Sequence, residues 1–114
     1  MSVHEKSVIV SAPVHEVYQM WTNFDDFPKF ISHIREVKML SPTKSHWRAK
    51  MDGIEQEWDA ETTRMEEDKA IAWECISGLE NRGEVRFDQV DSESTRVTVH
   101  FEYNPPAGIL GDVA

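Results

Sequence analysis

The residues with the clearest chemical potential lie at alternate positions of segment 54–65, where Trp58, Thr62 and Arg64 share one side and acidic residues occupy the other. An arginine at the end of an otherwise apolar face can hold a ligand carboxylate or ketone oxygen, because its guanidinium offers several fixed donors and stays charged. The alternative is a surface ion pair with Glu66 or the glutamate after it.

Large aromatic side chains recur with the same alternation in the segments that follow and precede this one. Such rings either line an apolar ligand pocket or fill a core, and the sequence leaves both possibilities open. Polar groups on the same faces, Gln56, Thr62 and Gln89, need partners, which a ligand, trapped water or neighbouring backbone could supply. The candidate ligand-binding residues are Trp47, Trp58, Thr62, Arg64, Trp73, Phe87, Gln89 and Phe101, and the catalytic candidates are Arg64 and Thr62.

Other kinds of chemistry find little support in the sequence. The five histidines have neither the helical spacing nor the neighbouring cysteine or carboxylate set that zinc requires, so no metal site is predicted. A phosphate-binding glycine loop, a nucleophile elbow and a cysteine with a recognisable histidine partner are also missing. We therefore expect no cofactor and no nucleophilic catalysis.

The charge balance narrows the class of partner. A net charge of -9, from 21 acidic and 12 basic side chains, would repel nucleic acid and anionic membranes. The sequence has no apolar run near the roughly 18 residues of a membrane span, and no signal peptide is recognisable. Its single cysteine, Cys75, cannot form an internal disulfide. These features favour a cytoplasmic protein that does not insert into membranes.

The first part of the chain predicts a strand and two helices. Segment 3–10 is rich in β-branched residues and ends before Pro13, which suits the first turn of a helix. Apolar residues at helical spacing follow, namely Val14, Val17, Tyr18 and Trp21. Because a proline disfavours helical geometry in the residue before it, we predict a second short helix over 28–32 rather than a continuation. Its buried side would come from Phe24, Phe27, Phe30 and Ile31.

From residue 34 onward the period changes to two, which predicts six antiparallel strands, at about 34–40, 44–51, 54–65, 70–77, 83–90 and 96–103. Asp52 and Gly53 are typical of a tight hairpin turn. Every strand has one face that is expected to be buried, and Trp58, Ala60 and Thr62 are expected to face the interior. The acidic outer row of residues 55, 57, 59 and 61 is expected mainly to favour solubility.

This order of elements, with the opening segment 8–18 (VIVSAPVHEVY) and the aromatic cluster at 24–30, resembles the START-like polyketide cyclase/dehydrase and lipid transport family over nearly the whole chain. The resemblance implies an α+β helix-grip fold, in which a curved seven-stranded antiparallel sheet with two short helices after the first strand wraps around a long C-terminal helix. Family members bind apolar or polycyclic molecules between sheet and helix.

The resemblance also suggests roles for individual residues. Trp58, Ala60, Thr62 and Arg64 resemble the inward strand face of the aromatase/cyclase members, in which the arginine is thought to position or protonate a polyketide. Ala60 replaces a large ring, and no counterpart of the family's catalytic tyrosine is found near Ile34. These departures favour binding over catalysis.

We therefore expect one domain over residues 1–114 that stops before the long helix. The favoured function is binding of a small hydrophobic or aromatic ligand, such as a lipid, quinone or polyketide-like molecule. The alternatives are a polyketide aromatase/cyclase or dehydratase that uses Arg64, and a protein-interaction domain. A homodimer could cover the open face of the sheet, because an apolar sheet face left in water promotes aggregation.

Overall fold

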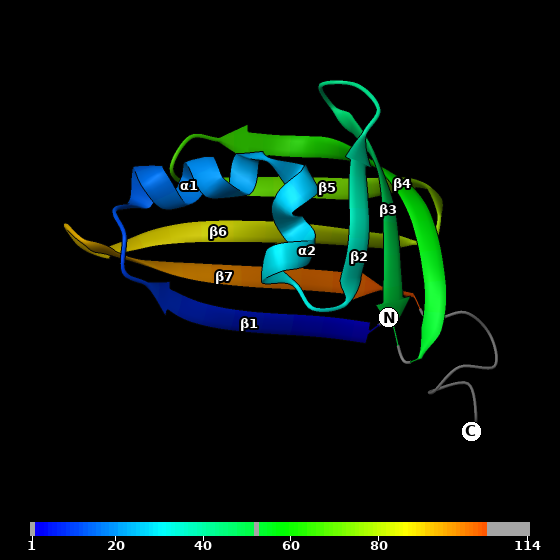
Figure 1. Ribbon diagram of the computed structural model, residues 1–114, viewed down its shortest axis with the longest axis horizontal. Coiled ribbons are helices and arrows are strands. Elements are labelled where there is room, and N and C mark those ends of the chain that lie inside the picture. Colours follow the sequence, from blue (N-terminus) through cyan, green and yellow to red (C-terminus); the bar gives the residue numbers. More distant parts are fainter. Residues whose placement is uncertain (1, 52, 105–114) are drawn as a thin grey trace.

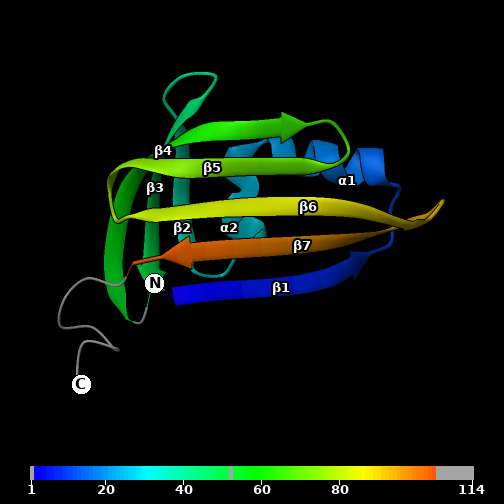
Figure 2. The same ribbon diagram turned by 180° about the vertical axis from the view of Figure 1, so that it is seen from behind.

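The computed structural model describes residues 2–51 and 53–104, which form one curved antiparallel sheet with helices on a single face (Figures 1 and 2). The strand order is β1-β7-β6-β5-β4-β3-β2. This arrangement confirms the predicted α+β fold with a curved seven-stranded sheet and two short helices. The strands are β1 (Ser2–Val10), β2 (Ile34–Met39), β3 (Lys44–Met51), β4 (Ile54–Glu66), β5 (Ala70–Gly78), β6 (Asn81–Asp91) and β7 (Ser94–Tyr103).

Helix α1 (Val14–Thr22) begins where the sequence predicts. Pro13 precedes it, and the Val17 amide donates to the Pro13 carbonyl over 3.1 Å to start the helical hydrogen bonds. Pro13 is the N-cap residue, with an extended backbone, and so precedes the first turn rather than lying in it as predicted. Its missing N–H costs nothing there, because the first helical hydrogen bond comes from the Val17 amide. Val17, Tyr18 and Trp21 are buried, so α1 packs its apolar stripe on β6 and β7.

The second helix lies earlier than predicted. A 3-10 turn, η1 (Phe24–Asp26), leads into α2 (Phe27–Phe30), and Phe27 is helical although a proline follows it. The proline occupies the first turn of α2, and Phe27 donates its amide hydrogen to the Phe24 carbonyl, which holds it in a helical conformation. Phe30 is 38% exposed rather than buried, although its ring stacks on Trp21 at 4.7 Å.

The strand pattern agrees with the predicted alternation. On β3 the alternate residues Ser45, Trp47, Ala49 and Met51 are buried. Met51 pairs with Ile54 and Gly53 has a φ of 80°, a left-handed conformation that favours glycine, so the predicted hairpin is present; Asp52 lies outside the described residues. The expectation that the chain stops before the long C-terminal helix concerns residues after Asn104, which are also outside the described residues.

The pairing of β4 with β5 contains two register shifts, one between Asp59 and Ala60 and one between Thr62 and Arg64. Thr62 lies opposite Trp73, but Arg64 lies opposite Ala72, the next residue back along β5. Because neighbouring residues of a strand point to opposite faces, the second bulge moves Arg64 to the other side of the sheet from Thr62. Figure 1 shows β4 curving strongly as it crosses from β5 to β3.

No helix in segments 2–51 and 53–104 is long and apolar enough to cross a membrane. Within the same segments, no group of three or more histidine, cysteine, aspartate or glutamate side chains is arranged to hold a metal ion.

Candidate ligand-binding site

Three indole rings stack on the concave face of the sheet, the face that the helices cover. Trp47 lies between Trp58, at a centroid distance of 5.7 Å, and Trp73, at 4.9 Å, and both pairs are nearly parallel. We call these three residues the tryptophan stack. Their exposed fractions are 0%, 1% and 1%, so the rings fill this part of the core. Of the two roles that the sequence left open for them, the structure shows filling.

Two phenylalanines from the helical segment close the stack on one side. The Phe27 ring packs edge-on against Trp47 at 5.3 Å and Trp73 at 5.6 Å, and Phe24 packs against Trp47 at 6.2 Å. Both phenylalanines are buried. The short helical turns after α1 therefore hold the stack against the sheet.

Gly83 of β6 provides the space that Trp73 occupies. A Cβ atom built at Gly83 would lie 2.2 Å from Cζ2 of Trp73, far closer than two carbons can approach. Gly83 pairs with Trp73 on one side and with Phe101 on the other. The indole therefore lies across β6 toward β7. Gly83 is not among the predicted site residues, because a glycine inside a strand does not indicate which ring packs over it.

The far side of the stack is less well covered. Phe101, whose ring centroid is 6.1 Å from that of Trp58, is only partly buried, as are Val99 and Thr62. Val8 of β1 pairs with the buried Val97, which places it on the concave face, yet it is 48% exposed. Phe101 borders the tryptophan stack, and the partly buried Val99 and the exposed Val8 extend the apolar surface from it, beside Lys6 and His4 of β1. We call Phe101, Val99 and Val8 the open strip.

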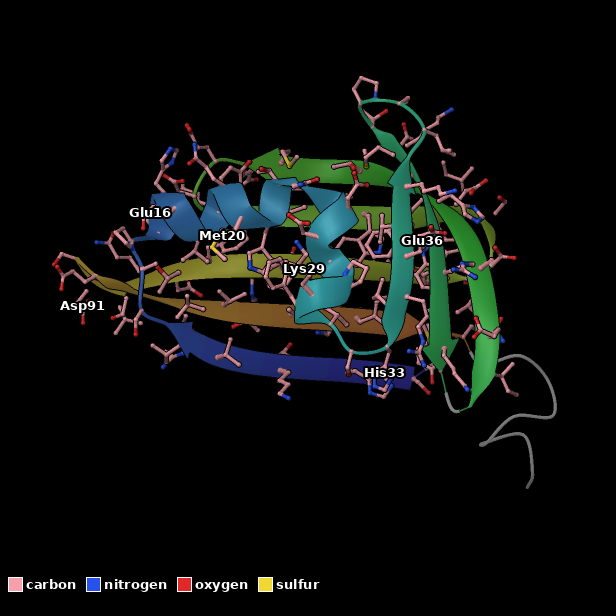
Figure 3. All side chains as sticks on the ribbon, viewed as in Figure 1. Glu16, Met20, Lys29, His33, Glu36 and Asp91 are labelled. Carbon is pink, nitrogen blue, oxygen red and sulfur yellow. The ribbon has the colours of Figure 1, made fainter. Side chains whose placement is uncertain are left out.

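Helix α1 adds to the accessible apolar surface on this side. Met20 is 47% exposed and projects from α1 on the side toward β6 in Figure 3. Phe87 is buried beneath the helix, where Tyr18 packs edge-on against it at 5.6 Å. Phe87 therefore belongs to the core under α1, and the exposed Gln89 lies beyond it on β6.

Arg64 does not lie on the concave face, which corrects the sequence interpretation. Its Nε and Nη2 donate to the two oxygens of Glu66 at 2.8 and 3.1 Å, and its Nη1 donates to Glu84 at 2.9 Å. These hydrogen bonds, with Glu66 first, raise the pKa of the guanidinium. The bulge after Thr62 explains the change, because it reverses the side to which the chain points.

The outer face around Arg64 carries a lattice of paired charges. Ala72, Glu84 and His100 are successive cross-strand neighbours there. The small alanine among long charged side chains leaves a hollow of about 330 Å³. Three basic side chains border the hollow, and each contacts a carboxylate: Arg64, Arg82 and His100. The charges of this outer face are therefore paired with one another.

Two histidines each bridge two carboxylates on the exterior. His46 contacts Asp59 at 2.6 Å and Glu57 at 3.1 Å, and these interactions raise its pKa, with the hydrogen bond to Asp59 the largest cause. His100 contacts Glu102 at 2.9 Å and Glu5 at 2.8 Å, which likewise raises its pKa, Glu102 first. The neighbouring carboxylates therefore stabilise the protonated form of both imidazoles.

Cys75, the single cysteine of the sequence, packs against the core. Its side chain is partly buried beside the core, and that burial raises the pKa of the thiol. A raised pKa suppresses the thiolate, which is the reactive form. The thiol therefore acts as a small apolar group of the interior.

Comparison with known proteins agrees with this architecture. Residues 10–114 match the family described as polyketide cyclase / dehydrase and lipid transport. An uncharacterised 17.2 kDa protein from Streptomyces lincolnensis, encoded in the melC2-rnhH intergenic region, is 35% identical over 106 residues, which cover 92% of this chain and 71% of that protein.

Two solved structures show a similar fold at low sequence identity. A START superfamily protein from Mycobacterium smegmatis has a TM-score of 0.77 at 16% identity, with 92% of this chain and 79% of that chain covered. The Zhui aromatase/cyclase from Streptomyces sp. R1128 has the same TM-score and identity, with 93% and 69% covered. The family match over residues 10–114 and the 35% identical relative show that the chain belongs to the polyketide cyclase/dehydrase and lipid transport family.

Proposed function

We propose that this protein binds a small, flat hydrophobic molecule on the concave face of its sheet, along the open strip and against the tryptophan stack. The observation that carries the proposal is the position of the open strip. It exposes Phe101 beside Trp58, one of three stacked and buried indoles, and continues to the exposed Val8 on β1. Apolar and aromatic walls of this kind are typical of small-molecule sites.

The site supports binding better than catalysis. The cyclase interpretation needed Arg64 beside the ligand, but its guanidinium is held on the opposite face by Glu66 and Glu84. Thr62 remains on the concave side, partly buried and opposite Trp73, where its hydroxyl can orient a ligand. A hydroxyl without an adjacent base is a weak nucleophile or acid, so binding is the role we assign.

Titration with fluorene, a flat hydrocarbon, followed by tryptophan fluorescence tests this function. We expect saturable binding that perturbs the buried indoles, and weaker binding by Phe101→Ala. Leu40→Ala is the matched control, because Leu40 is 60% exposed in the turn between β2 and β3 and lies outside the open strip. Absence of saturable binding, or equal losses in the two variants, would contradict the proposal.

Native mass spectrometry of the gently purified protein tests for a natural ligand and for the alternative occupant of the open strip. A monomer that carries an apolar molecule supports the proposal. A dimer without an adduct that also fails to bind fluorene would instead assign the same surface to a second copy of the chain, because one face cannot be covered by both.

A further inference from the structure

The two edge strands of the sheet differ in how well they are protected against pairing with another chain. β2 is only six residues long, and its pairing with β3 contains a register shift between Ile34 and Glu36. It also carries the charged side chains of Arg35 and Lys38. Short length, a bulge and charged side chains are the features that commonly keep an edge strand from adding another strand.

β1, at the opposite edge, has little of this protection. It is nine residues long and pairs with β7 from Ser2 to Val10 without a register shift. It contains no proline, and apart from a histidine its charged residues are Glu5 and Lys6. Figures 1 and 2 show β1 along the border of the sheet, and within the described ranges it pairs with β7 alone. Its outer edge therefore presents backbone N–H and C=O groups to a further strand.

Apolar side chains are exposed along the same strand. Val3, Val8 and Ile9 are 57%, 48% and 52% exposed. A long, regular edge strand with exposed apolar side chains is a template for strand addition, in which backbone hydrogen bonds supply affinity and side chains supply specificity. The side chains of β1 therefore determine which strand fits best.

The geometry of a second copy limits the possible registers. Two copies that extend one sheet in antiparallel orientation are related by a two-fold axis perpendicular to the sheet. Such an axis keeps the same face of both sheets on the same side. Because successive side chains alternate between faces, each residue must lie opposite one whose number differs by an even amount. One residue of β1 therefore lies opposite its own copy.

Charge selects among the three registers that pair most of the strand. Axes beside Glu5, Lys6 and Ser7 pair residues 2–8, 2–10 and 4–10, respectively. The first two place identical charges directly opposite each other, which is destabilising. With the axis beside Ser7, Lys6 lies opposite the partner's Val8, and Glu5 lies opposite the partner's Ile9. β1 is therefore complementary to itself in this register.

We infer that the protein forms a two-fold symmetric dimer, in which the β1 strands of two copies pair antiparallel about Ser7 and extend the sheet across both chains. The copies join edge to edge, so Phe101 and Val99 of the open strip stay accessible and the inference is independent of the proposed function. The net charge of -9 on each copy opposes association, which makes the dimer weak and reversible.

Charge substitutions at Val8 test the register. Val8→Lys places a like charge opposite the partner's Lys6 at two symmetry-related positions, which should raise the dimer Kd about two- to thirtyfold. Val8→Glu is the matched control, because it places opposite charges there and should leave the Kd unchanged or lower it. Overall charge repulsion alone predicts the reverse order, because the lysine reduces the net charge of -9 and the glutamate increases it. Analytical ultracentrifugation over a range of protein concentrations measures each Kd.

Cysteine cross-linking locates the interface without relying on affinity. Ser7→Cys places two thiols at directly opposite positions, whose Cβ atoms lie about 5 Å apart. Glu5→Cys and Ile9→Cys lie on the same face, but their thiols would be about 14 Å apart along the paired strands. A short bis-maleimide should therefore link Ser7→Cys into dimers far more than the other two variants. The wild type, with Cys75 alone, gives the background.

Three results would overturn the inference: a monomer at every concentration, equal cross-linking at the three positions, or a Kd for Val8→Lys no higher than that for Val8→Glu. Circular dichroism establishes that each variant is folded, and the cross-linking of Ser7→Cys remains decisive if a Val8 variant is not. A wild-type monomer that binds fluorene would refute the dimer and leave the proposed function intact. A dimer cross-linked at Ser7→Cys that does not bind fluorene would do the opposite.

Discussion

Replacement of Gly83 by alanine tests the packing of the tryptophan stack quantitatively. The added Cβ would lie 2.2, 2.6 and 2.7 Å from Cζ2, Cε2 and Cη2 of Trp73, so the indole must retreat by more than about 1 Å. Trp73 cannot do so freely, because Trp47 and Phe27 pack against it. Overpacking of this kind costs about 1 to 3 kcal/mol. The reduced entropy of the unfolded chain offsets about 0.4 to 1 kcal/mol of that loss.

We therefore expect Gly83→Ala to lower the free energy of unfolding by about 1 to 2 kcal/mol. Urea unfolding followed by circular dichroism measures this as a lower midpoint with an unchanged slope. In the background of Trp73→Phe, whose smaller ring leaves room for the methyl group, the penalty should largely disappear, which gives a double-mutant coupling energy of about 1 kcal/mol. An unchanged midpoint, or the same penalty in both backgrounds, would refute this account of the packing.

Three further predictions follow from burial and charge. Trp58→Ala should reduce the free energy of unfolding by about 3 to 5 kcal/mol, because the ring is 1% exposed. Urea unfolding measures this loss, and a value below about 2 kcal/mol would show that the ring is not packed as described. Arg64→Ala should leave fluorene affinity unchanged, since its side chain lies on the outer face, and a large loss of affinity in the same titration would contradict that placement. His46 and His100 have pKa values raised above the ordinary 6.5, so their stabilisation is fully present below about pH 6.5 and is lost as the pH rises through the folded-state pKa values. Thermal midpoints at several pH values should show this loss in the wild type and a smaller one in His46→Gln/His100→Gln; parallel pH profiles would contradict it.

The sequence was sufficient for the architecture because hydrophobic periodicity carries that information. The acidic alternation around Trp58 predicted one wet and one dry side for β4, and the Gly53 turn predicted the hairpin before it. Helix α1 followed from the spacing of Val17 and Trp21 together with Pro13. These features depend on local chemistry, which neighbouring residues in the chain determine.

The parts that sequence reasoning missed depend on contacts between distant segments. The bulge after Thr62 turns Arg64 to the outer face of the sheet, and no local residue pattern predicts that bulge. Trp47 and Trp73 pack against Phe27 beneath the helical turn. This packing depends on contacts between residues that are far apart in the sequence. Of the predicted ligand-binding residues, the three tryptophans fill the core and Arg64 lies on the outer face, so the candidate site is now centred on Phe101 and its neighbours in the open strip.

The most direct test of a ligand site on the concave face is methyl ¹H–¹³C NMR of the protein titrated with fluorene. Val8 and Val99 carry methyl groups on the concave side, and Ala72 carries one on the outer face. Our account predicts saturable shifts of the Val8 and Val99 methyl signals with little change at Ala72. Shifts centred on Ala72 and its outer-face neighbours, or no saturable shift at any of the three, would contradict it.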